Sequence, residues 1–173
     1  SSPGVGLTVV YGSTEAEPIS HIETELLTAA DWQTAADGGG LPVGHPVPEV
    51  RVMMRDEEII VTGDHVNKSY VDTARNAETK ITAHGEIWHC TGDRGRLDAQ
   101  GRLWLLGRAM GPVGIHPFAV ECAARSWPGV ADAACVVDET GAVSLFVAGD
   151  QVHSPEWQLA AARIGVSRVI PLM

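Results

Sequence analysis

The stretch Val9-Val10-Tyr11-Gly12-Ser13-Thr14-Glu15-Ala16-Glu17-Pro18-Ile19-Ser20 follows the first apolar run of the chain, residues 5–10. We expect that run to form a short buried strand, which residues 11–15 end abruptly. Gly12 would let the backbone approach another group closely, and the residues around it offer an aromatic ring, two hydroxyls and a carboxylate. Open α/β sheets bind ligands where strands deliver such groups from their carboxyl ends. Residues 11–15 alone fit either a polar turn or one wall of a nucleotide site.

Composition limits the classes of function. The chain has 173 residues, 45% of them hydrophobic, which is enough for one ordinary domain or two small ones. Its net charge of −10 argues against a nucleic-acid partner, although local amides, cations and Mg²⁺ can still hold ATP. No apolar run approaches the length of a membrane span, so we expect no stable membrane insertion. The three cysteines lack metal-ligand spacing and predict reduced thiols in a cytoplasmic protein.

The middle of the chain predicts an antiparallel β unit. Residues 41–48 should be extended because each X-Pro step disfavours helix. The expected strands are residues 49–54, 58–62, 86–90, 94–97 and 102–106, the last two joined by a hairpin turn at 98–101. Residues 19–30 fit a short helix or an irregular segment, and residues 71–82 a helical or looping connection. Residues 41–106 therefore predict a distorted antiparallel β-barrel.

The last third of the chain has a mixed composition. We expect helices at residues 117–125 and 155–164, a hairpin formed by residues 133–137 and 143–147, and a last strand at 166–172. A domain boundary is expected at Gly107-Arg108, giving domains 1–106 and 107–173. The expected fold class is α/β plus α+β: the end of an α/β subdomain, the β-barrel, and a small, mobile, truncated α+β domain.

Four sequence features recur in a recognisable order. They are Tyr11-Gly12-Ser13-Thr14-Glu15, Gly44-His45-Pro46-Val47-Pro48, Thr91-Gly92-Asp93 and Gly107-Arg108. Each is weak alone, but the ordered series resembles the C-terminal portion of the adenylate-forming superfamily, which includes acyl-CoA synthetases, peptide-synthetase adenylation domains and luciferases. Residues 94–104 are similar to the hairpin that precedes the hinge in that family.

The resemblance implies a role for each matching residue. Tyr11 would stack on the adenine of ATP, with Gly12 and Ser13 in the same nucleotide-binding segment. Thr14 would hydrogen-bond a phosphate, and Glu15 would hold Mg²⁺ through its carboxylate. The resemblance implies that Asp93 accepts hydrogen bonds from the ribose hydroxyls, whereas its position after Gly92 also fits a simple turn cap. Arg108 would reach the ribose or the phosphates.

The implied activity is that of an ATP-dependent ligase. A substrate carboxylate would attack the α-phosphate of ATP, giving an acyl-adenylate and pyrophosphate. The amino-acid sequences of residues 11–20 and 89–104 are most similar to those of the fatty-acid ligase and olefin β-lactone synthetase branch. That branch implies a fatty or hydroxy-fatty acid substrate, and either transfer to CoA or closure of a lactone by the substrate's own hydroxyl.

The chain also departs from the family pattern. It lacks the upstream phosphate loop and the terminal catalytic lysine of the family. The family's usual hinge motif is shortened at residues 109–115. We therefore expect an excised part of a longer enzyme, whose missing N-terminal part is its partner. On its own this chain should not form adenylates and should bind nucleotide weakly. The alternative is a non-catalytic nucleotide-binding or interaction module.

Other reactive side chains carry weaker signals. His65, His84, His89 and Cys90 have no metal-ligand spacing, and Cys122 lies in an apolar helical stripe without a nearby base. We interpret these residues as packing or surface residues rather than as ligands or nucleophiles. Lys68 and Lys80 are interpreted as solvated surface charges.

Overall fold

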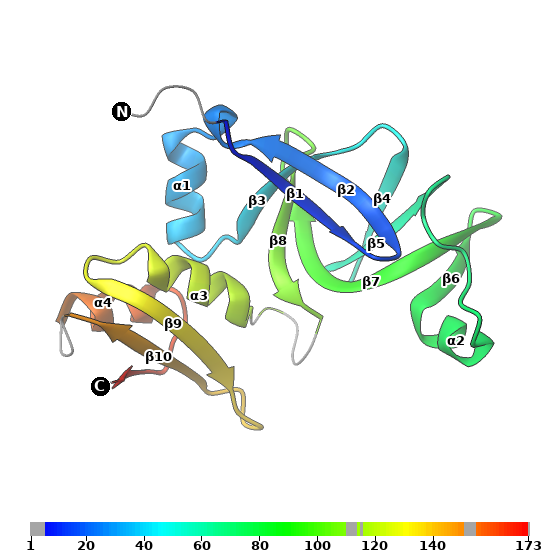
Figure 1. Ribbon diagram of the computed structural model, residues 1–173. Coiled ribbons are helices and arrows are strands. Elements are labelled where there is room, and N and C mark those ends of the chain that lie inside the picture. Colours follow the sequence, from blue (N-terminus) through cyan, green and yellow to red (C-terminus); the bar gives the residue numbers. More distant parts are fainter. Residues whose placement is uncertain (1–5, 110–113, 115, 151–154, 173) are drawn as a thin grey trace. The chain divides into compact units, whose positions relative to one another are not determined.

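The structure is a computed structural model, and it describes residues 6–109, 114, 116–150 and 155–172. Its contacts divide the chain into two compact units. The first contains residues 1–28 and 42–105, and the second contains residues 29–41 and 106–173. The division into domains at residue 106 stays a prediction, and these contacts place residues 29–41 with the second unit. Each unit is described by itself (Figure 1).

The first unit is built on one large sheet. Its strand order is β1-β2-β3-β8-β7-β5-β4, and β6 pairs with β7 outside that path. The strands are β1 (Thr8–Ser13), β2 (Ala16–Glu23), β3 (Leu41–Pro46), β4 (Val50–Arg55), β5 (Glu58–Gly63), β6 (Lys80–Ala83), β7 (Glu86–Leu97) and β8 (Leu103–Arg108). The strands predicted at 49–54, 58–62, 86–90, 94–97 and 102–106 are confirmed, although residues 86–97 form one long strand.

The opening of the chain differs from the expectation. Leu7 and Val10 are 64% and 55% exposed, so the first strand is not buried. It continues through Ser13 and returns at once as the antiparallel strand β2, where we expected a helix or an irregular segment. Ile19 and Ile22 supply buried apolar side chains of β2. The described residues therefore show an antiparallel hairpin here and no parallel α/β sheet.

The sheet is also open. Within the described residues, β1 and β4 stand at its two ends, so the predicted barrel is not closed, although β7 is strongly bent (Figure 1). Bending lets the sheet cover its own core without closure. A cluster of Ile60, Trp88 and Cys90 packs in that core with the half-buried Met53, Ile81 and Ala83.

Residues 71–82 combine the alternatives that the sequence left open. A 3₁₀ turn, η2 (Thr73–Arg75), is followed by the short helix α2 (Asn76–Thr79) and then by β6. Asp72 begins this segment by accepting a hydrogen bond from the Ala74 amide, as an N-terminal cap does. A second 3₁₀ turn, η1 (Thr24–Leu26), follows β2.

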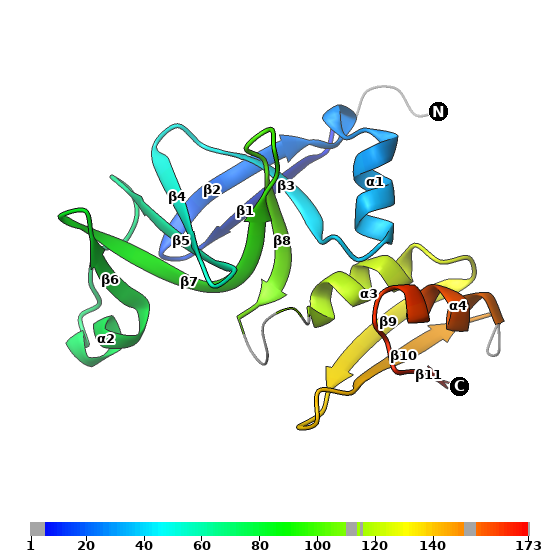
Figure 2. The same ribbon diagram turned by 180° about the vertical axis from the view of Figure 1, so that it is seen from behind.

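The second unit is a small α+β layer structure. It contains α1 (Ala29–Ala36), α3 (Pro117–Arg125), β9 (Val130–Val137), β10 (Val143–Gly149), α4 (Pro155–Arg163) and β11 (Arg168–Leu172). The sheet order is β11-β10-β9, with β10 and β11 parallel. Helices α3 and α4 cover one face of that sheet (Figures 1 and 2), and their core includes Leu145, Val147 and Trp157. The predicted helices, hairpin and last strand are confirmed.

Candidate nucleotide site

The tip of the β1–β2 hairpin carries five of the predicted site residues. Ser13 pairs with Ala16, so Thr14 and Glu15 form the two-residue turn between the strands. Gly12 lies in the irregularity between Tyr11 and Ser13, and a Cβ atom there would stand 2.8 Å from the Ala16 carbonyl oxygen. That approach is too close for any side chain, so the hairpin requires glycine at this position.

Two predicted residues from distant parts of the sequence meet in this unit. The hydroxyl of Tyr11 donates a hydrogen bond of 2.9 Å to Oδ2 of Asp93, although 82 positions separate them. Tyr11 is buried, with 6% of its surface exposed. The structure therefore brings the first and third sequence features side by side.

The Thr91-Gly92-Asp93 segment is held in a fixed conformation within β7. The buried hydroxyl of Thr91 donates to the Ile59 carbonyl oxygen at 2.8 Å and accepts the Asp93 amide at 3.1 Å. Gly92 has a φ of +70°, a conformation that glycine adopts without strain. Its amide donates to Oε1 of Glu58 at 3.3 Å. These bonds fix the backbone that presents the Asp93 carboxylate.

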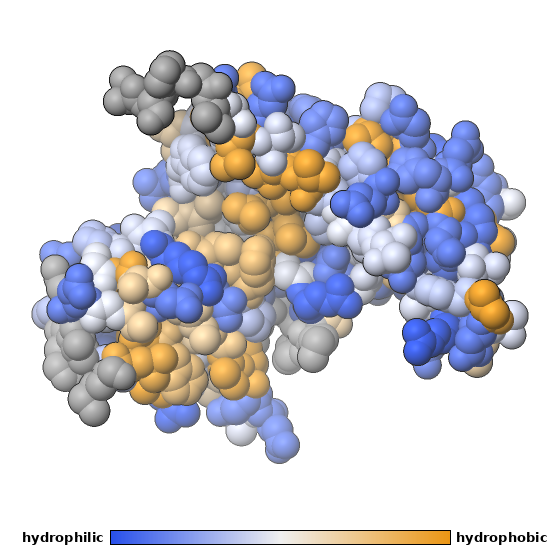
Figure 3. Space-filling view, viewed as in Figure 1, coloured by the Kyte–Doolittle hydropathy of each residue, from blue (hydrophilic) through white to orange (hydrophobic). Residues whose placement is uncertain are grey.

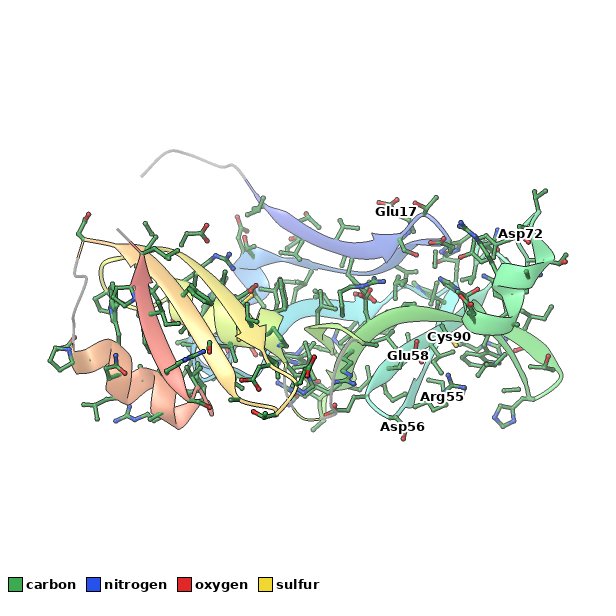
Figure 4. The ribbon with its side chains drawn as sticks, turned by 90° about the horizontal axis from the view of Figure 1, so that it is seen from below. Glu17, Arg55, Asp56, Glu58, Asp72 and Cys90 are labelled. Atoms are coloured by element: carbon green, nitrogen blue, oxygen red, sulfur yellow. The ribbon has the colours of Figure 1, made fainter. Side chains whose placement is uncertain are left out.

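Glu58 belongs to a small polar cluster with Arg55 and Cys90 (Figure 4). The Arg55 guanidinium donates to Oε2 of Glu58 at 3.2 Å and to Sγ of Cys90 at 3.5 Å. Burial, and then the neighbouring Glu58 charge, raise the pKa of the Cys90 thiol. A thiol with a raised pKa is a poor nucleophile, so the cluster supports the Asp93 segment rather than reacting.

The carboxylate of Glu15 also has a tyrosine partner. Tyr70 donates a hydrogen bond of 2.8 Å to Oε1 of Glu15, and this bond is the main reason that the pKa of Glu15 is lowered. The buried Oγ of Ser13 meets no partner with full hydrogen-bond geometry within the described residues, but its hydroxyl is near enough to Glu15 to help lower the pKa of that carboxyl. The lowered pKa keeps Glu15 ionised at neutral pH.

Lys80 is part of the same surroundings, which corrects its interpretation as a solvated surface charge. Its Nζ donates to the Asn67 carbonyl oxygen at 2.6 Å, lies 3.2 Å from Nδ1 of His89 and stands 4.9 Å from the centre of the Tyr70 ring. Burial lowers the pKa of Lys80. Lys68 is exposed, as expected for a surface charge, and its Nζ donates to Oγ1 of Thr62 at 2.8 Å.

The groups at the hairpin tip fit Mg²⁺ and a phosphate. A carboxylate and hydroxyl oxygens are the ligands that a hard cation prefers, and Ser13 offers a buried hydroxyl without a partner in the described residues. Thr14 is exposed at the turn. The surface around α2 and β6 is mostly hydrophilic in the view of Figure 3, which suits a charged ligand better than an apolar one.

Arg108 ends β8 and belongs to the second compact unit, where its side chain is exposed. Its predicted contact with the nucleotide stays a prediction. Sequence reasoning missed three supporting residues: Tyr70 bonds the Glu15 carboxylate, the Asn67 amide bonds the Glu15 backbone carbonyl, and Glu58 holds the segment of Asp93. No spacing in the sequence marks these residues, because each lies at least 34 positions from its partner and meets it only in the folded unit.

The described residues contain no group of three or more His, Cys, Asp or Glu side chains arranged to hold a metal ion. Cys90, Cys122 and Cys135 are free thiols. No helix in the described part of the chain is both long enough and apolar enough to cross a membrane.

Comparison with known proteins identifies the relatives of this chain. No family model matches it. It is 33% identical over 123 residues to the D-alanine–D-alanyl carrier protein ligase of Lactococcus lactis, covering 69% of this chain and 23% of that protein. It is 31% identical over 175 residues to the olefin beta-lactone synthetase of Stenotrophomonas maltophilia, covering 82% of this chain and 30% of that protein. The chain thus spans less than a third of either relative.

The fold has solved counterparts. O-succinylbenzoate coenzyme A synthetase (MenE) from Bacillus subtilis, in complex with ATP and magnesium ion, superposes with a TM-score of 0.71 at 23% identity, covering 96% of this chain and 38% of that one. At this identity the likeness establishes the fold. These relatives and structural neighbours are adenylate-forming ligases of the AMP-binding superfamily, and the chain matches their C-terminal portion.

Proposed function

We propose that this chain is the C-terminal part of an ATP-dependent ligase that activates a carboxylic acid as its adenylate. The observation that carries the proposal is the hydrogen bond between Tyr11 and Asp93, which joins two residues that lie far apart in sequence and that the family resemblance places in one nucleotide site. The ionised Glu15 at the same hairpin adds the carboxylate that Mg²⁺ needs. The fold shared with adenylate-forming ligases supports the same conclusion.

In this proposal each site residue has one task. Tyr11 stacks on the adenine, and Asp93 accepts hydrogen bonds from the ribose hydroxyls. Gly12 and Ser13 let the hairpin backbone approach the nucleotide, and Thr14 hydrogen-bonds a phosphate. Glu15 holds Mg²⁺, which when bound offsets the negative charge of the phosphates. Arg108 reaches the ribose or the phosphates.

The proposed reaction forms one bond and breaks one. An oxygen of the substrate carboxylate attacks the α-phosphorus of ATP, and the bond from that phosphorus to the pyrophosphate oxygen breaks. Both reactants are anions, so the residues of the site act mainly by holding them close together and by offsetting their charge. The site transfers no proton in this step.

The substrate and the final acceptor are narrower proposals. The proposed substrate is a fatty or hydroxy-fatty acid, whose acyl group is then transferred to CoA or closed into a lactone. The sequence of residues 11–20 and the olefin beta-lactone synthetase among the relatives support this proposal. The MenE neighbour is named as a coenzyme A synthetase, which supports CoA as an acceptor. The free thiols support a cytoplasmic location.

Exchange of labelled pyrophosphate into ATP tests the proposal. The complete protein should catalyse exchange with one member of a panel of fatty, hydroxy and amino acids. Asp93→Ala and Glu15→Ala should each lower kcat/KM for ATP about 10- to 100-fold, because each removes charge-assisted contacts to the nucleotide. Asp138→Ala, in a turn of the second unit, should have no effect.

Two results would contradict this assignment. Wild-type exchange rates in both variants would show that the nucleotide lies elsewhere. ATP binding without exchange for any acid would instead support the alternative, a nucleotide-binding module without turnover.

A further inference from the structure

We propose that Tyr70 is the positioning residue of Glu15: it fixes the carboxylate that holds Mg²⁺ with the nucleotide. This inference rests on the proposed function, because it assigns the metal to Glu15. Its basis is the 2.8 Å hydrogen bond from the Tyr70 hydroxyl to Oε1 of Glu15. An ionised carboxylate can accept about four contacts, so one bond from Tyr70 orients the group and leaves capacity for a cation.

The segment around Tyr70 holds Glu15 at two points. The Asn67 amide donates to the backbone carbonyl oxygen of Glu15 at 2.7 Å, while Tyr70 holds the carboxylate. A two-residue turn at the tip of a hairpin has few contacts of its own, and a glutamate there would otherwise sample several rotamers. Fixing both the backbone and the side chain selects one carboxylate orientation before any ligand arrives.

Tyr70 is itself held firmly. Its amide donates to Oδ1 of Asn76 at 2.8 Å, and the ammonium of Lys80 stands 4.9 Å from the centre of its ring. Lys80 in turn donates to the carbonyl oxygen of Asn67 at 2.6 Å. Asn67, Tyr70, Asn76 and Lys80 therefore form one connected group, from which the Tyr70 hydroxyl bonds the Glu15 carboxylate.

The hydrogen bond between Tyr70 and Glu15 has a simpler explanation, in which Tyr70 only stabilises the packing of the hairpin tip against the rest of its unit and can be called a fastening residue. A fastening residue would change the stability of the fold and leave the metal dependence of nucleotide binding as it is. A positioning residue changes the metal dependence itself. Removal of a group that orients a metal ligand costs about 10- to 100-fold in metal affinity in other proteins.

The test compares nucleotide binding by wild type and Tyr70→Phe in the complete protein. Calorimetric titration with ATP at a series of free Mg²⁺ concentrations gives the Mg²⁺ concentration that half-saturates the metal-dependent gain in affinity. For Tyr70→Phe we expect that concentration to rise about tenfold. Affinity for ATP without Mg²⁺ should stay at the wild-type value. Phenylalanine keeps the ring beneath Lys80, so the variant removes one oxygen atom only.

Three further variants separate the possible outcomes. In a Glu15→Gln background, Tyr70→Phe should cause no additional shift, because its target carboxylate is absent. Asn76→Ala releases the Tyr70 backbone and should shift the Mg²⁺ requirement in the same direction, which provides a second route if Tyr70→Phe folds poorly. Thr34→Val removes a hydroxyl that bonds only within α1, and should change nothing.

The results that overturn the inference differ from those that overturn the proposed function. If Glu15→Gln abolishes the Mg²⁺ dependence while Tyr70→Phe and Asn76→Ala leave it unchanged, Tyr70 is only a fastening residue. A shift of equal size in the Glu15→Gln background would show that Tyr70 acts through another group. A wild-type protein that binds no ATP at any Mg²⁺ concentration would overturn both proposals.

Discussion

The Tyr11 hydroxyl and the Asp93 carboxylate share a hydrogen bond of 2.9 Å across two strands that are distant in sequence. Tyr11 lies in the edge strand β1, and Asp93 lies in the central strand β7. A second tyrosine–carboxylate pair, Tyr70 with Glu15, lies at the tip of the same hairpin. Each of the two predicted carboxylates thus accepts a hydrogen bond from a phenol, which reduces its rotational freedom.

Tyr11→Phe should weaken the fold. The substitution removes a hydrogen bond to a charged group, so we expect the free energy of unfolding to fall by about 2 kcal/mol. Urea denaturation measures the change. In an Asp93→Asn background, Tyr11→Phe should lower the free energy of unfolding clearly less, because the acceptor is then neutral. Equal losses of stability in both backgrounds would show that the two residues are not coupled.

Asp98 should stabilise the β7–β8 hairpin through its charge. Burial opposes that charge, but hydrogen bonds from the Trp104 indole and from the backbone and guanidinium of Arg102 lower the pKa of Asp98 to about 2. The unfolded chain protonates this residue near pH 4, so the stabilisation is complete above that pH and is lost as the pH falls towards 2.

The shift corresponds to about 2 kcal/mol at neutral pH. Asp98→Asn should therefore lower the free energy of unfolding by about that amount, and the difference from wild type should shrink in acid. Asp138→Asn is the matched control, because Asp138 accepts similar turn hydrogen bonds at an exposed position. An Asp98→Asn difference that did not change with pH would contradict the charge argument.

Gly44 should tolerate no side chain. Its φ is +88°, and a Cβ atom would lie 2.0 Å from the His21 carbonyl oxygen in the neighbouring strand. Gly101 has a similar φ of +78° with nothing within 4 Å of the same atom. Gly101→Ala should therefore cost only the backbone strain, about 1–2 kcal/mol. Gly44→Ala should lower the free energy of unfolding clearly more than Gly101→Ala does. Thermal unfolding of the two variants compares the losses directly. Equal losses of stability would show that β2 and β3 are not tightly packed at Gly44.

His89 should make stability depend on pH below neutrality. Burial, and then the nearby Lys80 charge, lower its pKa from the ordinary value of 6.5. The unfolded chain therefore takes up a proton at a higher pH than the native protein does, so stability falls as the pH drops below about 6.5. His89→Gln should remove this contribution. Denaturation of both proteins from pH 8 to 5 measures it, and parallel pH profiles would refute the prediction.

Local patterns determined much of the fold. The β-branched runs at residues 49–54 and 58–62 became β4 and β5, and the Asp98–Gly101 turn formed where its residues indicated. Local signals sufficed there because each element pairs with its neighbour in the chain. Local patterns did not predict the strand at residues 16–23. This strand pairs with β1 on one side and with β3 on the other, so which of its side chains are buried is decided by the assembled sheet.

The sequence by itself determined which residue types could form a nucleotide site: the order of Tyr11, Glu15 and Asp93 indicated one through a family resemblance. The tertiary structure alone decided which groups hold them, namely Tyr70 for Glu15 and Glu58 for the Asp93 segment. The reason is physical. Hydrogen bonds between residues 34 to 82 positions apart depend on strand order and bending, which arise from the packing of the whole sheet and leave no local spacing to detect.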